Sequence, residues 1–243
     1  MDLPDFNFEE KLWQRGFRFV AGADEVGRGS FAGPVVAAAV VFEPTALALS
    51  SRAFGSQKGA NRSLVQINDS KKLRPRQREK AAIWIKENAY SWAIGASSVA
   101  EINKLGVGKA TQIAFRRAIA GCELDIEYLL IDAFYVPYLR GLNKRRQKPI
   151  VKGDSLSVSI AAASIIAKVE RDGLMRKLSR QFKEYRWGKN KGYGTKEHRE
   201  AIKKYGTTKH HRRAFTTKWQ DLLTTKWQAP IIDSSFSRVL SDA

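Results

Sequence analysis

Two apolar stretches near the start of the chain read as the first strands of a sheet. Residues 17–26 and 33–43 are rich in Val, Ala and Phe, and a short segment containing Gly and Ser joins them. This pattern predicts an antiparallel hairpin. A third strand is predicted over 90–99, where apolar and polar positions alternate. A fourth is predicted over 127–134, "EYLLIDAF", whose continuous apolar run is typical of a strand buried on both faces.

Helical patterns lie between and after these strands. Pro75 suits the first turn of a helix that continues through "RQREKAAIWIKENA". In "GVGKATQIAFRRAIAG" the apolar residues recur at helical spacing, and Gly121 is expected to end that helix. A long helix is predicted from about Ser155 to Phe182, and its small residues allow close packing against a sheet. The basic segment before it, "RRQKPIVKGD", is predicted to be a turn.

The alternation of strands and helices predicts an α/β domain over residues 1–175. Residues 176–243 differ, because Lys, Arg, Gly and aromatic residues interleave there, and we expect a separate basic part of the chain that ends in a tail. One short helix in this part is expected to be capped by Thr195 and to end at Gly206. Residues 44–66 lack a clear period and are expected to form a surface loop.

Two short features of the extension point only to local structure. The sequence "TTKWQ" occurs at 216–220 and again at 224–228, which is too little for a repeat architecture and suggests local amphipathic structure. The last stretch, "APIIDSSFSRVLSDA", is expected to be a loosely held tail.

The charge balance points to a polyanionic partner. Lys and Arg number 43 against 24 Asp and Glu, which gives a formal net charge of +19 and a pI near 10.1. Such an excess favours nucleic-acid binding, because neutralising phosphates and releasing counterions supplies much of the affinity. The alternative is that the charge serves solubility alone.

Cys122 is the only cysteine, so the chain can form neither an internal disulfide nor a cysteine-based zinc site. A single cysteine fits a reducing compartment. The N-terminal sequence is acidic and interrupted by Pro4, unlike a signal peptide, and no apolar run is long enough to span a membrane. We therefore expect a cytoplasmic protein.

Four acids stand at the ends of predicted elements. Asp24 and Glu25 interrupt an apolar strand, Asp132 ends the strand "YLLID", and Asp154 lies just before the long helix. Asp154 has an alternative role as a helix N-cap, and Asp132 as the cap of a turn. Adjacent buried carboxylates are costly without a cation, and hard oxygen ligands favour Mg²⁺ or Mn²⁺. Together with the basic surface, they indicate a metal-dependent nuclease or phosphotransferase.

Six blocks of the sequence occur in a recognisable order: "GADEVGRGSFAGPVVAAAVVF", "NDSKKL", "LLIDAF", "IVKGDSLSVSIAAASIIAKVERD", "NKGYGTKEH" and "HRRAF". Together they resemble the motif blocks of bacterial-type ribonuclease HII over about residues 17 to 215. The resemblance implies a ribonuclease H-like mixed sheet flanked by helices, with a basic, mainly helical C-terminal extension over residues 176–243 that binds substrate. It also implies an endonuclease that cuts the RNA strand of RNA–DNA hybrids. Such an enzyme also cuts 5′ of a single ribonucleotide in duplex DNA, leaving 3′-hydroxyl and 5′-phosphate ends.

The resemblance implies roles for individual residues. The four acids become the catalytic, metal-binding carboxylates of a two-metal mechanism, with Mg²⁺ or Mn²⁺ as cofactor. The implied substrate-binding residues are a loop that holds the ribose 2′-hydroxyl, an aromatic ring that stacks on the following deoxyribose, and three lysines: Gly27, Arg28, Gly29, Tyr193, Lys71, Lys72 and Lys168. The implied partners are RNA–DNA hybrid and ribonucleotide-containing duplex DNA, and a monomer is expected. From the residues alone, Tyr193 has the alternative of being an ordinary loop aromatic. The alternative for Lys168 is that its side chain simply extends to solvent or pairs with a neighbouring residue.

Some features depart from the family pattern or remain outside it. The loop at 44–66 looks longer than usual, and Leu156 stands where a basic residue is common. We assign no chemistry to the three histidines, which lack zinc-site partners: His198, His210 and His211. The sister family, ribonuclease HIII, usually has Glu at the fourth acid, no Arg in the loop and an extra N-terminal domain. A non-catalytic basic coating protein would explain the charge but not four acids at element ends.

Overall fold

A single five-stranded sheet forms the centre of the molecule. The computed structural model describes residues 3–45 and 65–220. The sheet order is β3-β2-β1-β4-β5. The first three strands pair antiparallel, whereas β1, β4 and β5 run parallel to one another. The strands are β1 (Val20–Val26), β2 (Val35–Phe42), β3 (Ser91–Ser97), β4 (Tyr128–Asp132) and β5 (Gln147–Ile150).

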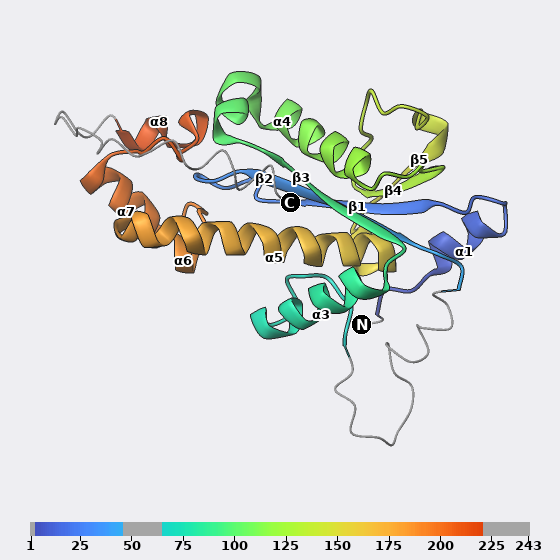
Figure 1. Ribbon diagram of the computed structural model, residues 1–243. Helices are drawn as coiled ribbons and strands as arrows, with labels where there is room; N and C mark the ends of the chain where they lie inside the picture. The colour runs from blue at the N-terminus through green and yellow to red at the C-terminus, as the bar shows by residue number, and fades with distance from the viewer. Residues whose placement is uncertain (1–2, 46–64, 221–243) are drawn as a thin grey trace, which may run out of the picture.

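Helices cover both faces of this sheet (Figure 1). One face packs on α4 (Val99–Gly121), and the other packs on the long α5 (Val158–Gln181) with α3 (Pro75–Asn88) beside it. Two glycines allow close approach: a Cβ on Gly22 would collide with the α5 backbone at Ser159, and one on Gly95 would collide with the α4 backbone at Ala114. The predicted close packing of the long helix on the sheet is confirmed. A short N-terminal helix, α1 (Asn7–Trp13), packs near the start of α5.

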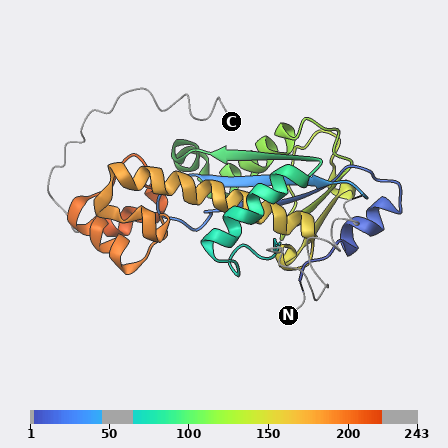
Figure 2. The same ribbon diagram turned by 60° about the horizontal axis from the view of Figure 1, so that its bottom comes forward.

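The remaining helices gather at the far end of α5 (Figure 2). They are α6 (Trp187–Asn190), α7 (Lys196–Tyr205) and α8 (Arg213–Gln220), preceded by a 3-10 turn, Lys183–Tyr185. A separate apolar cluster packs α6 and α7 against the end of α5, with Trp187 and Tyr185 fully buried at its centre. Because α5 continues past residue 175, the α/β part and the C-terminal part share one helix. Within the described residues, no helix has the length and apolar character needed to cross a membrane.

Most predicted elements are present with shifted ends. The hairpin, the strand over 91–97, the helix from Pro75, and the short helix capped by Thr195 and ended by Gly206 are confirmed. The helix that ends at Gly121 is longer than predicted, because it begins at Val99 and is kinked at Gly106. The first "TTKWQ" copy lies in α8, while the second, the tail and most of the 44–66 loop lie outside the described residues.

One prediction about local structure is wrong, and one alternative is excluded. The basic segment predicted as a turn contains β5, an edge strand that tolerates Pro149. Asp154 is not the N-cap of the long helix: α5 begins at Val158, and the Ser157 hydroxyl accepts from the Ile160 amide. Asp154 lies instead in a 3-10 turn, Gly153–Ser155, ahead of the helix.

Candidate active site

The ends of three parallel strands bring the acids to one edge of the sheet. Ala23 of β1 pairs with Ile131 of β4, so Asp24 and Asp132 are the next residues on adjacent strands. Asp132 in turn pairs with Ile150, the last residue of β5, and Asp154 follows in the next turn. The carboxyl ends of parallel strands are where ligands collect in open α/β sheets. Residues 24, 25, 132 and 154 therefore meet although they are far apart in sequence.

Asp24 and Glu25 lie where β1 extends beyond the end of its pairing with β4. The pairing of β1 with β4 stops at Ala23, while its pairing with β2 continues to Val26. The Asp24 side chain is buried toward α5, where it accepts a hydrogen bond from Ser164. Strand alternation puts Glu25 on the opposite face. The two side chains thus leave the strand on opposite faces where the sheet opens, and both remain close enough to Asp132 for its charge to raise their pKa values.

Asp132 is tied to the turn that carries Asp154. Its Oδ1 accepts a hydrogen bond from the Gly153 amide at 2.9 Å, rather than capping the turn that follows β4. The bond fixes the turn that holds Asp154 against the end of β4. The turn-cap alternative for Asp132 is therefore not what the structure has.

The acids influence one another electrostatically. Burial raises the pKa of Asp24 well above its ordinary value, and the charges of Glu25 and Asp132 raise it further. Burial also raises the pKa of Glu25, which the Arg28 charge opposes and the Asp132 charge reinforces. The pKa of Asp154 is raised by burial, lowered by Lys71, and raised again by Asp69 and Asp132. A cluster of desolvated carboxylates of this kind is stabilised by cations.

Two basic side chains lie against the acids. Lys71 Nζ is 3.4 Å from Asp154 Oδ2 and 4.0 Å from Asp69, and Arg28 Nη1 is 3.8 Å from Glu25. Although burial opposes it, the charges of Asp154, Asp69 and Asp24 raise the pKa of Lys71. In the part of the chain that is described, no three Asp, Glu, His or Cys side chains are arranged to hold one metal ion. The chemistry of the four acids nevertheless fits a hard divalent cation, because they offer carboxylate oxygens without histidine or cysteine.

The loop after β1 contains Gly27, Arg28 and Gly29, and its backbone lies against the Arg171 side chain of α5. Gly27 has φ +89°, and a Cβ there would collide with the Arg171 side chain, so glycine is required. A Cβ on Gly29 would meet nothing within 4 Å, so this part of the loop is open. Arg28 is half exposed and lies 5.2 Å from the centre of the Phe134 ring.

Tyr193 lies above two cations of α5. Its ring centre is 5.5 Å from Arg171 Cζ and 5.9 Å from Lys168 Nζ, and the side chain is 37% exposed. Lys168 also forms an ion pair with Asp172 of the same helix at 2.8 Å, and this is the local pairing that was the alternative to substrate binding for this lysine. Lys72 Nζ is 3.4 Å from the Ser155 hydroxyl, beside the Asp154 turn.

A buried hydrogen-bond network supports the backbone of Tyr193. Trp187 Nε1 donates to His198 Nε2 at 3.0 Å, which leaves His198 Nδ1 to donate to the Tyr193 carbonyl at 2.9 Å. His211 Nδ1 accepts from the Thr208 amide, so its Nε2 is the donor toward His198 at 3.2 Å. Burial lowers the pKa of both histidines, that of His211 to about 3. Both rings are therefore neutral with fixed tautomers and serve structure.

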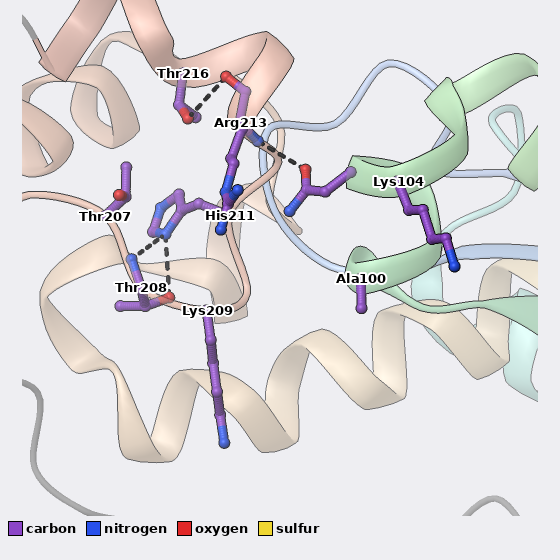
Figure 3. A pocket seen from close by; sticks show the side chains of 9 residues that line it. Ala100, Lys104, Thr207, Thr208, Lys209, His211, Arg213 and Thr216 are labelled. Atoms are coloured by element: carbon purple, nitrogen blue, oxygen red, sulfur yellow. Dashed lines mark hydrogen bonds between the residues drawn. The ribbon is translucent and has the colours of Figure 1, made fainter.

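An open cavity of about 610 Å³ lies beside this network, between the start of α4 and the start of α8 (Figure 3). Its lining contains three cations and no acid: Lys104, Lys209 and Arg213. The Arg213 amide donates to Asn103 Oδ1, which joins α8 to α4. The preceding residue, Arg212, donates to the Arg28 carbonyl in the loop after β1.

Sequence reasoning did not single out several residues that support the site. Asp69 and Ser164 lie inside motif blocks, but neither the pairing of Asp69 with Lys71 nor the hydrogen bond from Ser164 to Asp24 is visible from spacing. Arg171 and Arg212 are fully buried and bind only backbone carbonyls. Both lie in quoted blocks, but nothing in the sequence distinguishes a buried arginine from an exposed one.

Comparison with known proteins identifies the family of the chain. A family model described as Ribonuclease HII matches residues 21–220. The protein named Ribonuclease HII from Caldanaerobacter subterraneus subsp. tengcongensis is 46% identical over 211 residues, covering 87% of this chain and 79% of that protein. The protein of the same name from Wolbachia sp. subsp. Brugia malayi is 46% identical over 217 residues, covering 88% of this chain and 94% of that protein.

Solved structures show the same fold. The ribonuclease H2 from Pyrococcus horikoshii OT3 superposes with a TM-score of 0.65 at 23% identity, covering 84% of this chain and 97% of that one. Bst-RNase HIII in complex with Mn²⁺ gives a TM-score of 0.60 at 22% identity, covering 85% of this chain and 70% of that one. The ribonuclease H-like fold is confirmed, and the family-model match decides between HII and HIII. The chain therefore belongs to the ribonuclease HII family and is an endonucleolytic hydrolase of the ribonuclease H type.

Proposed function

We propose that this enzyme, besides acting on RNA–DNA hybrids as its family does, incises duplex DNA 5′ of a single embedded ribonucleotide, leaving 3′-hydroxyl and 5′-phosphate ends. The observation that carries the proposal is the meeting of four carboxylates beside a glycine loop at one edge of the sheet. The net charge of +19 supports binding of a nucleic-acid duplex.

Asp24, Glu25, Asp132 and Asp154 are proposed as the metal-binding, catalytic residues. The support is their convergence, their desolvation and the absence of softer ligands among them. Two divalent ions, Mg²⁺ or Mn²⁺, would supply an activated water and stabilise the leaving oxygen when bound. Asp132 also holds the Asp154 turn through the Gly153 amide, which keeps the two carboxylates in register. The solved Bst-RNase HIII structure contains Mn²⁺, which agrees with a metal of this kind.

Gly27, Arg28 and Gly29 are proposed to hold the ribose 2′-hydroxyl. The hydroxyl distinguishes RNA from DNA at one position, and glycine lets backbone groups approach it closely. Tyr193 is proposed to stack on the deoxyribose that follows, because its ring is partly exposed and lies close to the cation Arg171. Lys71, Lys72 and Lys168 would bind the substrate backbone near the acids.

The basic cavity of Figure 3 is proposed as part of the duplex-binding surface of the C-terminal extension. Three cations on separate elements, without a carboxylate among the lining residues, favour phosphate binding. Replacing Lys104 by Ala should weaken binding to all duplexes alike and reduce the slope of log affinity against log salt by about 1. An unchanged slope would remove this residue from the surface.

The enzyme is further proposed to act as a monomer in the cytoplasm. The single cysteine, Cys122, is buried and free, which fits a reducing compartment. Light scattering coupled to gel filtration tests the monomer, and a mass twice that of the chain would contradict it.

The incision proposal is tested with an end-labelled DNA duplex that contains one ribonucleotide. Incision at its 5′ side is expected with Mg²⁺ or Mn²⁺ and none with EDTA, while an all-DNA duplex of the same sequence stays intact. Binding without incision under every metal would favour a coating protein. Cleavage of a continuous hybrid but not of the single ribonucleotide would limit the function to hybrids.

A further inference from the structure

Two arginines are buried in the C-terminal part of the molecule without an acidic partner. Arg171 of α5 and Arg212 before α8 are both fully buried. Among the described residues, neither guanidinium pairs with a carboxylate within 4.0 Å. Burial and the neighbouring Arg171 charge lower the pKa of Arg212 to about 9, so it remains charged at neutral pH. Burying two like charges without a carboxylate partner opposes folding.

Arg212 binds the loop that follows β1. Its Nη1 donates to the Arg28 carbonyl at 2.8 Å, its Nε and Nη2 donate to the Gly33 carbonyl at 2.9 and 2.8 Å, and Nη2 also reaches the Pro34 carbonyl at 3.0 Å. One planar group thus fixes both ends of the segment 28–34. Only a guanidinium presents enough donors in a rigid plane to do this.

Arg171 joins the same loop to the segment that carries Tyr193. Its Nε and Nη2 donate to the Pro34 and Ala32 carbonyls at 3.0 and 3.1 Å, and its Nη1 donates to the Lys191 carbonyl at 2.9 Å. The same side chain lies against Gly27 and beneath the Tyr193 ring. Arg171 therefore contacts both of the elements proposed to recognise the ribonucleotide.

Backbone hydrogen bonds complete the connection. The Phe31 and Ala32 amides donate to the Gly192 carbonyl at 2.8 and 3.1 Å, and the Arg212 amide donates to the Phe31 carbonyl at 2.7 Å. Gly192 has φ +81°, and a Cβ there would collide with the Ala32 carbonyl, so the two segments lie in close contact. The glycine loop and the Tyr193 segment form one unit.

We propose that Arg171 and Arg212 are positioning residues that hold the Gly27–Gly29 loop and Tyr193 at one fixed separation, so that the ribose 2′-hydroxyl and the next deoxyribose are recognised together. This rests on the proposed function. A single embedded ribonucleotide offers one place where both contacts form at once. A continuous hybrid has a ribose at every position of its RNA strand and no deoxyribose to meet Tyr193. The arginines therefore matter more for the first substrate than for the second.

The test compares Arg212→Lys with wild type on both substrates. Lysine keeps the charge but cannot bind the carbonyls of Arg28, Gly33 and Pro34 together. The expected result is a fall in kcat of about tenfold or more on the single ribonucleotide and of less than about threefold on the hybrid, with KM changed little, because small misplacements cost kcat. Tyr193→Ala should then cost less in the Arg212→Lys background than in wild type. Arg180→Lys, an exposed change on α5, is the matched control.

Rates are divided by the folded fraction, which is measured by circular dichroism. If Arg212→Lys does not fold, Arg171→Lys, which keeps one donor group, is compared with wild type on the same two substrates. An equal fall on both substrates, or a fully additive effect of Tyr193→Ala, would mean that the arginines only support folding and would overturn the inference. Failure of the wild type to incise the single ribonucleotide would instead refute the proposed function.

Discussion

Asp132 accepts a hydrogen bond from the Gly153 amide, and through it the end of β4 holds the turn that carries Asp154. The two acids are 22 residues apart in sequence, yet the parallel pairing of β4 with β5 brings their segments to the same sheet edge. Asp24, next to Asp132 on β1, completes the row. The position of the acids therefore depends on the order of the strands. A substitution at one of these acids that leaves the strand pairing intact should lower the reaction rate more than the stability of the fold.

Asp132→Asn tests this separation of chemistry from folding. The amide oxygen of Asn can still accept from Gly153, so the fold should remain, while the lost negative charge weakens metal binding. Because even groups that only orient metal ligands cost about 10–100-fold, a fall in kcat of more than about a hundredfold is expected. Steady-state rates and circular dichroism measure the two effects.

Asp125→Asn, an exposed change just before β4, is the control and should keep wild-type activity. Loss of the folded spectrum in Asp132→Asn would mean that the carboxylate is mainly structural.

Lys71→Ala should shift the pH dependence of activity. The Lys71 charge lowers the pKa of Asp154 against the larger effect of burial. Without it that pKa rises, so a higher pH is needed to ionise Asp154, and the acidic limb of the kcat/KM profile should move to higher pH. Lys72→Ala provides the comparison, because Lys72 lies against the Ser155 hydroxyl and not a carboxylate. An acidic limb that stays in place in Lys71→Ala would show that Asp154 does not control it.

Tyr193→Ala should reduce selectivity rather than stability. The ring is 37% exposed and packs on Arg171 from one side, so its removal leaves the buried core intact. Cleavage at a single ribonucleotide should fall about tenfold or more, which corresponds to about 1.4 kcal/mol of transition-state stabilisation. Tyr193→Phe keeps the ring and should keep most of the rate. A Tyr193→Ala enzyme with wild-type rates on this substrate would refute the assignment to the sugar that follows.

The buried histidines make folding sensitive to acid. The pKa of His211 is about 3 in the folded protein, mainly through burial, against about 6.5 for an unperturbed histidine. Between these values the unfolded chain binds more protons, so stability falls as pH falls. From pH 7 to pH 5 this residue should account for a loss of about 2 kcal/mol.

Urea unfolding of wild type and His211→Gln at both pH values measures the histidine contribution. The variant should be less stable at pH 7 but should lose about 2 kcal/mol less than wild type on going to pH 5. Equal losses in the two proteins would show that His211 is not held neutral.

The strands, the helices and the place of the four acids at element ends follow from local patterns, whereas the ribonuclease H-like fold was predicted from the resemblance of the six motif blocks. Strands and helices with clear periods, such as 91–97 and the helix from Pro75, were predicted within a few residues. The edge strand β5 was missed because four residues with a Pro carry almost no periodic signal. The start of α4 was missed because Gly106 looks like a breaker, although Ser98 and Glu101 form a capping box that could have marked it.

The supporting groups depend on tertiary structure and could not be predicted. Ser157, not Asp154, caps α5, and this follows only from where the chain leaves the 3-10 turn. Arg171 and Arg212 look like ordinary basic residues in a basic protein, and only the fold shows that they are buried against backbone carbonyls.

The most direct measurement of the central claim is Mn²⁺ binding followed by electron paramagnetic resonance. Wild type should bind Mn²⁺, and Asp24→Asn, Glu25→Gln, Asp132→Asn and Asp154→Asn should each weaken binding, whereas Asp125→Asn should not. Wild-type Mn²⁺ affinity in all four variants would contradict a metal site built from these carboxylates.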